Sequence, residues 1–294
     1  MVPAISEDFD DEAPIGSRKA EYNGHVWTRE AVDPIVPALE AICNSATPSA
    51  TSRSLLDRNI IQLYPPEPKT SDNFVTPGPK YPHCVIAGIN GIRTSFIQAI
   101  SHAEYLGSFA NQSVNWTYNK THGTIIDAVE AIFLNYTGYS PNTSNALLNQ
   151  WTQFHEANKG FPRAKLLQFC HSQGAIDVRN TLANALHEIR ERVIVVAIAP
   201  AAVVPDELCF KSFNYASKND PIHFVELALA GGFDTNEFGI SKAHEMILEN
   251  HNELILLDPH SDASDIDHDF QSPTFKPIIE KHINDYLEIY RDLK

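Results

Sequence analysis

A serine at the end of an apolar run is the strongest candidate for chemistry in this chain. Residues 166–169 read Leu-Leu-Gln-Phe, Cys-His-Ser-Gln-Gly follows at 170–174, and a helical pattern begins at once. A strand, a tight turn and a helix in this order raise the hydroxyl of Ser172 above a sheet, and the following N–H groups face whatever it attacks. The sequence therefore predicts nucleophilic chemistry at Ser172.

The turn departs at one position from the Gly-x-Ser-x-Gly pattern of a nucleophile elbow, because Cys170 occupies the first glycine position. A small residue is needed there, since the turn brings backbone and helix close together. Cysteine is small enough to fit. The thiol is a rival nucleophile, but its side chain alternates away from the turn apex, so we interpret it as buried and inert.

Acidic and basic residues follow Ser172 in the order that a Ser-Asp-His triad requires. Asp220 comes just after a short predicted strand at 212–216, and His268 lies in the polar loop after another at 254–257. A serine hydroxyl needs an adjacent base, and histidine suits that role because its ordinary pKa is ~6.5. An aspartate orients the imidazole and stabilises its charged form. We therefore predict Ser172, Asp220 and His268 as the catalytic residues.

Two histidines of the last loop compete for the role of base. His260 follows its strand almost directly, whereas His268 lies eight residues later, just before a predicted helix. The base must curl back over the nucleophile, so reach favours His268, and His260 stays open as the alternative. His171 is a poor base because neighbouring residues on a tight turn point apart. We expect it to pack on the sheet or line the substrate pocket.

The loop after an earlier apolar run, residues 84–88, is the candidate for the oxyanion hole. It reads Ile-Asn-Gly-Ile at 89–92, and in this arrangement such a loop supplies one oxyanion N–H. Gly91 is expected to permit the unusual backbone angles that turn an amide inward. We predict the N–H groups of Ile92 and Gln173 as oxyanion donors, and Asn90, Gly91 and His171 as substrate-binding residues. A plain β-α turn rich in Asn and Gly is the alternative.

Three stretches carry a family resemblance: Ala-Gly-Ile-Asn-Gly at 87–91, Phe-Cys-His-Ser-Gln-Gly-Ala at 169–175 and His-Asp-Phe-Gln-Ser-Pro-Thr at 268–274. Together they resemble a family of uncharacterised chlamydial proteins, from which no reaction can be carried over. Over roughly residues 80–290 the chain also resembles, more distantly, the serine lipases and esterases of the α/β-hydrolase class. That resemblance implies Ser172 as nucleophile, Asp220 as acid and a histidine of the last loop as base.

The pattern along the chain predicts an α/β fold with a mostly parallel sheet flanked by helices, α/β-hydrolase-like in its order. Strands are predicted near 84–88, 113–118, 166–170, 193–199, 212–216 and 254–257. Helices are predicted near 95–106, 124–134, 145–157, 173–190, 223–230, 241–250 and 274–291. The run at 193–199 is continuous and rich in β-branched residues, which is typical of a parallel strand buried on both faces.

The chain divides into three predicted zones. Residues 1–16 are acidic and predicted to be disordered. Residues 17–82 form an irregular extension, in which six prolines between 65 and 82 favour extended backbone and exclude helix. We expect this extension to wrap the sheet as an edge strand or to serve as a linker. Residues 83–294 are predicted to form the catalytic domain.

Composition limits the partners that the chain could have. A formal net charge of -15 argues against nucleic acid and against docking on anionic lipid. No segment has the ~18 apolar residues of a membrane span, and the acidic start is unlike a signal peptide. Four cysteines show no metal or disulfide spacing. We therefore expect no metal or other cofactor, and a location in the cytoplasm or export without a cleavable signal peptide.

These observations together predict a serine hydrolase that acts on a small-molecule or lipid ester, a thioester or an amide. Two alternatives remain. The loop at 260–269 is dense in Asp and carries two histidines, ligand types that bind divalent cations, although its spacing matches no EF-hand or zinc pattern. The other alternative is a catalytically degenerate scaffold that acts as an interaction or effector protein, because fold does not dictate function. The sequence names no protein partner.

Overall fold

The computed structural model of the chain describes residues 20–22, 25–27, 64, 66–92, 94–120, 141–220, 222 and 253–291. The disorder predicted for 1–16 and the helices predicted near 124–134, 223–230 and 241–250 lie outside the described residues. Near the N-terminus, β1 (Ala20–Tyr22) and β2 (His25–Trp27) pair antiparallel as a separate two-stranded sheet.

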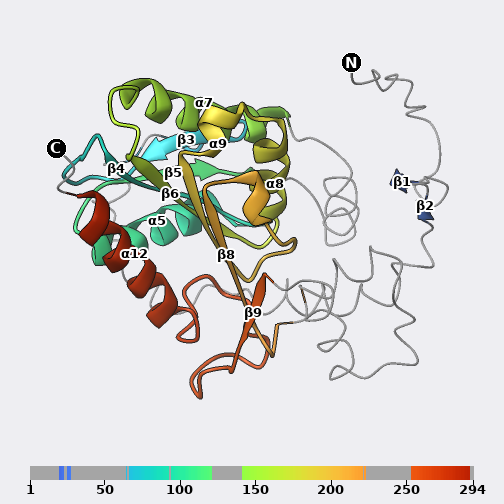
Figure 1. The fold of residues 1–294 in the computed structure, drawn as a ribbon. Coiled ribbons are helices and arrows are strands. Elements are labelled where there is room, and N and C mark those ends of the chain that lie inside the picture. Colours follow the sequence, from blue (N-terminus) through green and yellow to red (C-terminus); the bar gives the residue numbers. More distant parts are fainter. Residues whose placement is uncertain are drawn as a thin grey trace.

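The main sheet has seven strands in the order β3-β5-β4-β6-β7-β8-β9 (Figure 1). They are β3 (Asp72–Val75), β4 (Cys84–Ile89), β5 (Val114–Tyr118), β6 (Lys165–His171), β7 (Val193–Ile198), β8 (Lys211–Ser217) and β9 (Leu254–Leu257). The edge strand β3 runs antiparallel to β5, and the other neighbouring pairs are parallel. The predicted mostly parallel sheet is confirmed, and β3 adds residues of the predicted extension to it.

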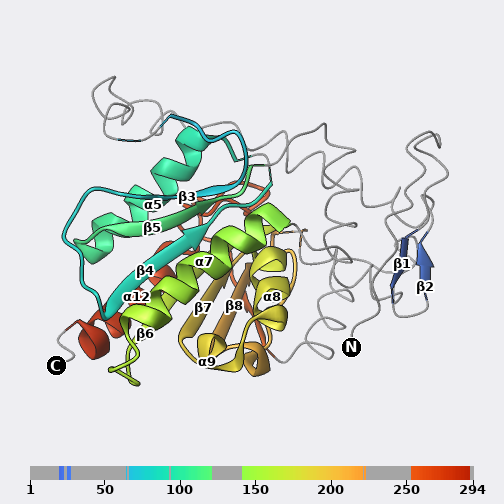
Figure 2. The same ribbon diagram turned by 90° about the horizontal axis from the view of Figure 1, so that it is seen from above.

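Helices cover both faces of this sheet (Figures 1 and 2). They are α5 (Phe96–Ala110) and α12 (Lys276–Tyr290) on one face, with α7 (Pro141–Ala157), α8 (Gly174–Asn184) and α9 (His187–Arg190) on the other. The start of α5 follows from sequence, because Ser95 and Gln98 form a reciprocal capping box around its first turn. Asn111 ends the same helix in the left-handed conformation.

Two apolar layers hold the helices to the sheet. Trp116, Phe169 and Phe270 are completely buried in the layer under α5 and α12. Trp151 and Leu182 lie in the layer under α7 and α8. Because each large apolar side chain contributes about 1.5–3 kcal/mol on full burial, these layers supply a rigid platform for the loops at the strand ends.

The helix predicted near 173–190 is two helices in the structure. Ala185 and Leu186 between them adopt extended backbone angles, with ψ of 154° and 144°. Leu186 is 62% exposed, whereas Ile189 remains buried in α9. The extended pair redirects the chain so that α9 keeps Ile189 in the core, and this change of direction leaves no trace in the periodicity.

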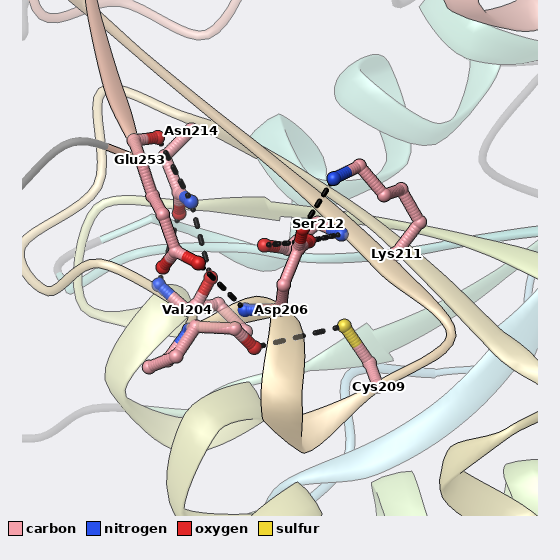
Figure 3. A network of polar contacts seen from close by, with 8 residues as sticks. Val204, Asp206, Cys209, Lys211, Ser212, Asn214 and Glu253 are labelled. Carbon is pink, nitrogen blue, oxygen red and sulfur yellow. Dashed lines mark hydrogen bonds and ion pairs between the residues drawn. The ribbon is translucent and has the colours of Figure 1, made fainter.

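A polar network surrounds the connection between β7 and β8, where the short 3-10 helix η2 (Asp206–Leu208) lies (Figure 3). One carboxylate oxygen of Asp206 accepts hydrogen bonds from the backbone N–H of Ser212 at 2.7 Å and from its hydroxyl at 3.0 Å. The other oxygen pairs with Lys211. The backbone N–H of Asp206 donates to Glu253, just before β9, at 3.1 Å. These contacts tie the amino ends of β8 and β9 together.

Candidate active site

Ser172 occupies the turn between β6 and α8, at the carboxyl edge of the sheet. Its φ of 53° lies in the left-handed region, which residues other than glycine seldom adopt. Such a conformation costs on the order of 1 kcal/mol or more and persists where the surroundings hold it. Here the N–H of Ser172 donates to Ile198 at 3.4 Å and its carbonyl accepts from Ala201 at 3.1 Å, so the end of β7 fixes the turn.

The residues on the two sides of the turn, Cys170 and Gly174, are small for different reasons. A Cβ on Gly174 would lie 2.9 Å from the carbonyl oxygen of Asn90, so only glycine lets α8 start this close to the end of β4. Cys170 is completely buried in the layer that also contains Ala87 and Ala197. Burial raises the pKa of its thiol, which supports the interpretation of an inert side chain.

Asp220 and His268 form a hydrogen-bonded pair at the same edge. The Nδ1 atom of His268 lies 2.8 Å from Oδ2 of Asp220, whose side chain is completely buried. The other carboxylate oxygen of Asp220 accepts from the backbone N–H of Ile222 at 2.9 Å. An imidazole that donates from Nδ1 to a carboxylate leaves Nε2 as a proton acceptor. The pair therefore has the tautomer that a general base requires.

His171 connects the elbow to the loop that carries His268. Its Nε2 lies 2.7 Å from the carbonyl oxygen of His268, to which it donates, and the two ring centroids are 4.9 Å apart. Burial, with smaller effects of His268 and His102, holds the pKa of His171 well below its usual range. The neutral ring thus positions the loop beside Ser172, while its predicted contact with substrate stays a prediction.

No hydrogen bond joins the Ser172 hydroxyl to the His268 ring among the described residues. In sites without substrate this contact is often long and shortens in the reacting complex. The position of His268 relative to the elbow is given by the His171 bridge instead. This bridge brings together two residues that are 97 positions apart in the chain.

Asp267 anchors the loop from within. Its carboxylate is completely buried and accepts hydrogen bonds from the hydroxyls of Ser272 and Thr274. The Thr274 oxygen also accepts from the backbone N–H of His260 at 2.9 Å. Sequence reasoning missed this role of Asp267, because it interpreted the acidic loop as a base carrier or a cation site. The only available signal was the Ser and Thr that closely follow it.

His260 takes a different position from His268. Its side chain is 47% exposed, and its Nδ1 accepts a hydrogen bond from the backbone N–H of Asp262 at 3.1 Å. In the described part of the chain, no three His, Cys, Asp or Glu side chains gather as a metal site. The acidic loop therefore contributes one histidine to the carboxylate pair, and that histidine is His268.

The loop after β4 lies directly against Ser172. A Cβ on Gly91 would lie 2.6 Å from Cβ and 3.2 Å from Oγ of Ser172. The expectation that Gly91 needs unusual backbone angles was wrong, since Gly78 is the only described glycine with positive φ. Glycine is needed at 91 for space. The predicted oxyanion residues Ile92 and Gln173 directly follow Gly91 and Ser172, respectively.

The Asn90 side chain is fully occupied within the protein. Its Nδ2 donates to the carbonyl oxygens of Gly91 and Asn119, both at 2.9 Å. Its Oδ1 accepts from the N–H of Asn119 at 3.0 Å and from the indole of Trp116 at 3.3 Å. These four bonds use both donors and both acceptor positions of the amide. The sequence predicted contact with substrate, whereas the structure uses this side chain to hold the loop.

The described core has the α/β-hydrolase-like fold that the sequence predicts. Its mostly parallel sheet, helices on both faces and strand-turn-helix at Ser172 together make that arrangement. No family model and no curated protein matches the chain. The resemblance to a chlamydial family therefore remains a prediction.

Solved structures with similar folds include an arylesterase, with a TM-score of 0.44 and 10% identity, covering 87% of this chain and 99% of that one. A lidless α/β serine hydrolase of Xanthomonas campestris has a TM-score of 0.38 and 13% identity, with coverages of 76% and 96%. A carboxylesterase of Bacillus cereus has a TM-score of 0.40 and 17% identity, with coverages of 75% and 95%.

The described helices are all too short or too polar to cross a membrane.

Proposed function

We propose that this chain is a serine hydrolase that cleaves a small-molecule or lipid ester through an acyl-enzyme intermediate. One observation supports the proposal: His268, which pairs with the buried Asp220, accepts a hydrogen bond at its backbone carbonyl from His171, the residue before Ser172 in the left-handed turn. Thioesters and amides react by the same steps, so they belong to the substrate class. No cofactor is needed for this chemistry.

In the first half-reaction, the oxygen of Ser172 forms a bond to the carbonyl carbon of the substrate. His268 takes the serine proton at Nε2, and Asp220 stabilises the imidazolium through Nδ1. The tetrahedral intermediate then collapses, the bond to the leaving alcohol breaks, and His268 returns the proton to that alcohol. The product of this step is a serine ester on Ser172.

The negative charge of the intermediate rests on the former carbonyl oxygen. We assign the N–H groups of Ile92 and Gln173 to that oxygen, because their two segments meet where Gly91 contacts Ser172. Two preorganised donors away from bulk water are worth ~3 kcal/mol or more each in the transition state. Water then attacks the serine ester, with His268 as base, and releases the carboxylic acid.

A fluorophosphonate probe tests the proposal because it phosphonylates only an activated serine. We expect labelling of the wild-type protein and of Cys170→Ala, and loss of labelling in Ser172→Ala. A short-chain ester should follow the same pattern of turnover. Labelling that survives in Ser172→Ala would remove this residue as the nucleophile. A folded wild-type protein that neither reacts with the probe nor turns over the ester would favour the degenerate scaffold instead.

A further inference from the structure

Asn119 links the oxyanion loop to the helix that follows the nucleophile. It comes directly after β5, and its backbone N–H and carbonyl are both bound by the side chain of Asn90, at 3.0 and 2.9 Å. Its own Nδ2 donates to Oδ2 of Asp177, on the first turn of α8, at 3.0 Å. A continuous chain of hydrogen bonds thus runs from Gly91 through Asn90 and Asn119 to Asp177.

The far end of this chain is a buried carboxyl group that the catalytic steps do not use. Asp177 is 3% exposed, and its backbone carbonyl accepts from the hydroxyl of Thr181. The side-chain oxygen of Asn119, Oδ1, accepts a hydrogen bond from the hydroxyl of Thr143 at 3.2 Å. A polar group is costly to bury. Its use is therefore to be sought in what it holds.

The residues at the two ends of this series of hydrogen bonds explain why it matters for Ser172. Gly91, in the loop after β4, lies close to Ser172. Asp177 belongs to α8, which begins two residues after Ser172. The hydrogen bonds therefore join the two segments that would supply the oxyanion donors. A shift of either segment changes the distance between the donors and the oxyanion.

We propose that Asp177 is a positioning residue, which through Asn119 and Asn90 sets the oxyanion loop over Ser172. The inference rests on the proposed function, because an oxyanion hole has a use only in acyl transfer. Donor placement acts in the transition state and little in the ground state. Loss of the link is therefore expected to lower kcat and to leave KM nearly unchanged.

A matched pair of substrates isolates this effect: an aryl ester and the corresponding thionoester, in which sulfur replaces the carbonyl oxygen. Sulfur is a larger and weaker hydrogen-bond acceptor, so the thionoester gains little from well-placed N–H donors. Asp177→Leu should lower kcat for the oxygen ester about 10-fold and for the thionoester less than about 3-fold. Asp177→Asn keeps an oxygen acceptor for Asn119, and its kcat should stay within about 2-fold of wild type.

Asn119→Ala removes the same hydrogen bond from the donor side, so it can replace Asp177→Leu if that variant does not fold. It should change the ratio of the oxygen-ester rate to the thionoester rate in the same way. Asp206→Ala loses a partly exposed polar network at the opposite edge and should leave the ester-to-thionoester ratio unchanged. Suppose that the wild type is active and that Asp177→Leu and Asn119→Ala fold. If their rates on the ester and the thionoester are unchanged, or fall by the same factor, the inference is overturned and the proposed function stands. A folded wild type that turns over neither substrate would overturn the proposed function and the inference with it.

Discussion

Two aspartates at opposite edges of the same sheet lie in opposite electrostatic settings. Asp206, at the amino edge, pairs with Lys211 and accepts hydrogen bonds from Ser212. Partial burial alone would raise the pKa of Asp206, but these contacts outweigh it and hold the pKa below its usual range. Asp177, at the carboxyl edge, is buried beside Asn119, and burial raises its pKa to about 7.

The difference indicates which edge is built for stability. The amino edge satisfies its charged groups with neighbours, as a purely structural region should. The carboxyl edge instead holds a serine with positive φ, a buried carboxyl group whose pKa is raised by burial, and a histidine held neutral by burial. Departures of this kind concentrate at functional sites, where geometry for chemistry takes precedence over stability.

The largest expected effect separates the two histidines of the last loop. His268→Gln should lower kcat/KM for a short-chain ester about 10⁴-fold or more, because the nucleophile loses its base. His260→Gln is the matched control and should stay within about 3-fold, since its ring is half exposed and bonds locally to Asp262. If His260→Gln were the more damaging change, the role of base would pass to that residue.

The next effect compares aspartates across the sheet. Asp220→Asn should fold and lose about 10³- to 10⁴-fold in kcat, because an amide can favour the wrong tautomer of His268. Asp206→Asn and Asp177→Asn should each stay within about 3-fold, measured on the same ester at pH 7.5. Equal damage from all three substitutions would mean that the triad acid had been assigned to the wrong strand.

Adding a methyl group at two glycines tests how closely the site at the carboxyl edge is packed. Gly91→Ala should lower kcat about 100-fold, because its Cβ would lie 2.6 Å from that of Ser172 and one of the two must move. Gly160, between α7 and β6, has no neighbouring atom within 4 Å of an added Cβ. Gly160→Ala should therefore leave kcat unchanged. A fully active Gly91→Ala enzyme would show that the β4 loop tolerates displacement without harm to catalysis.

The smallest effect is a pair of pH dependences of opposite sign, measured by denaturant unfolding. The raised pKa of Asp177 means that the folded state binds its proton more tightly, so this residue lowers stability as pH rises from about 4 to about 7. Asp177→Asn should remove that decline and gain on the order of 3 kcal/mol over wild type across this window. The neighbouring Cys170 thiol stays neutral there, because burial raises its pKa.

Asp206 should behave in the reverse way. Its lowered pKa contributes stability that is present above pH 4 and is lost as pH falls further. Asp206→Asn should therefore be less stable than wild type at pH 7, by less than about 1 kcal/mol because the pair is partly exposed, and the difference should shrink as the pH falls below 4. Two variants with the same sign of pH dependence would contradict the comparison between the two edges.

Much of the fold could be predicted because its signals are local. All six predicted strands are present, and their ends differ from the predicted ones by at most one residue. An edge strand was one expectation for residues 17–82, but the bounds of β3 were not predicted, because its four residues lie among prolines and only Phe74 is buried. The break between α8 and α9 was missed because Leu186 continues the apolar period although it points to solvent.

The sequence by itself determined the elbow at Ser172 and the order of Asp220 and His268 after it, because strand periods and turn residues act over a few positions. Only the tertiary structure decided which groups support them. Asn119 meets Asp177 across 58 residues, and His171 meets His268 across 97. Such contacts depend on which strand ends adjoin at one edge of the sheet, and sheet order is set by packing of the whole core rather than by any local pattern.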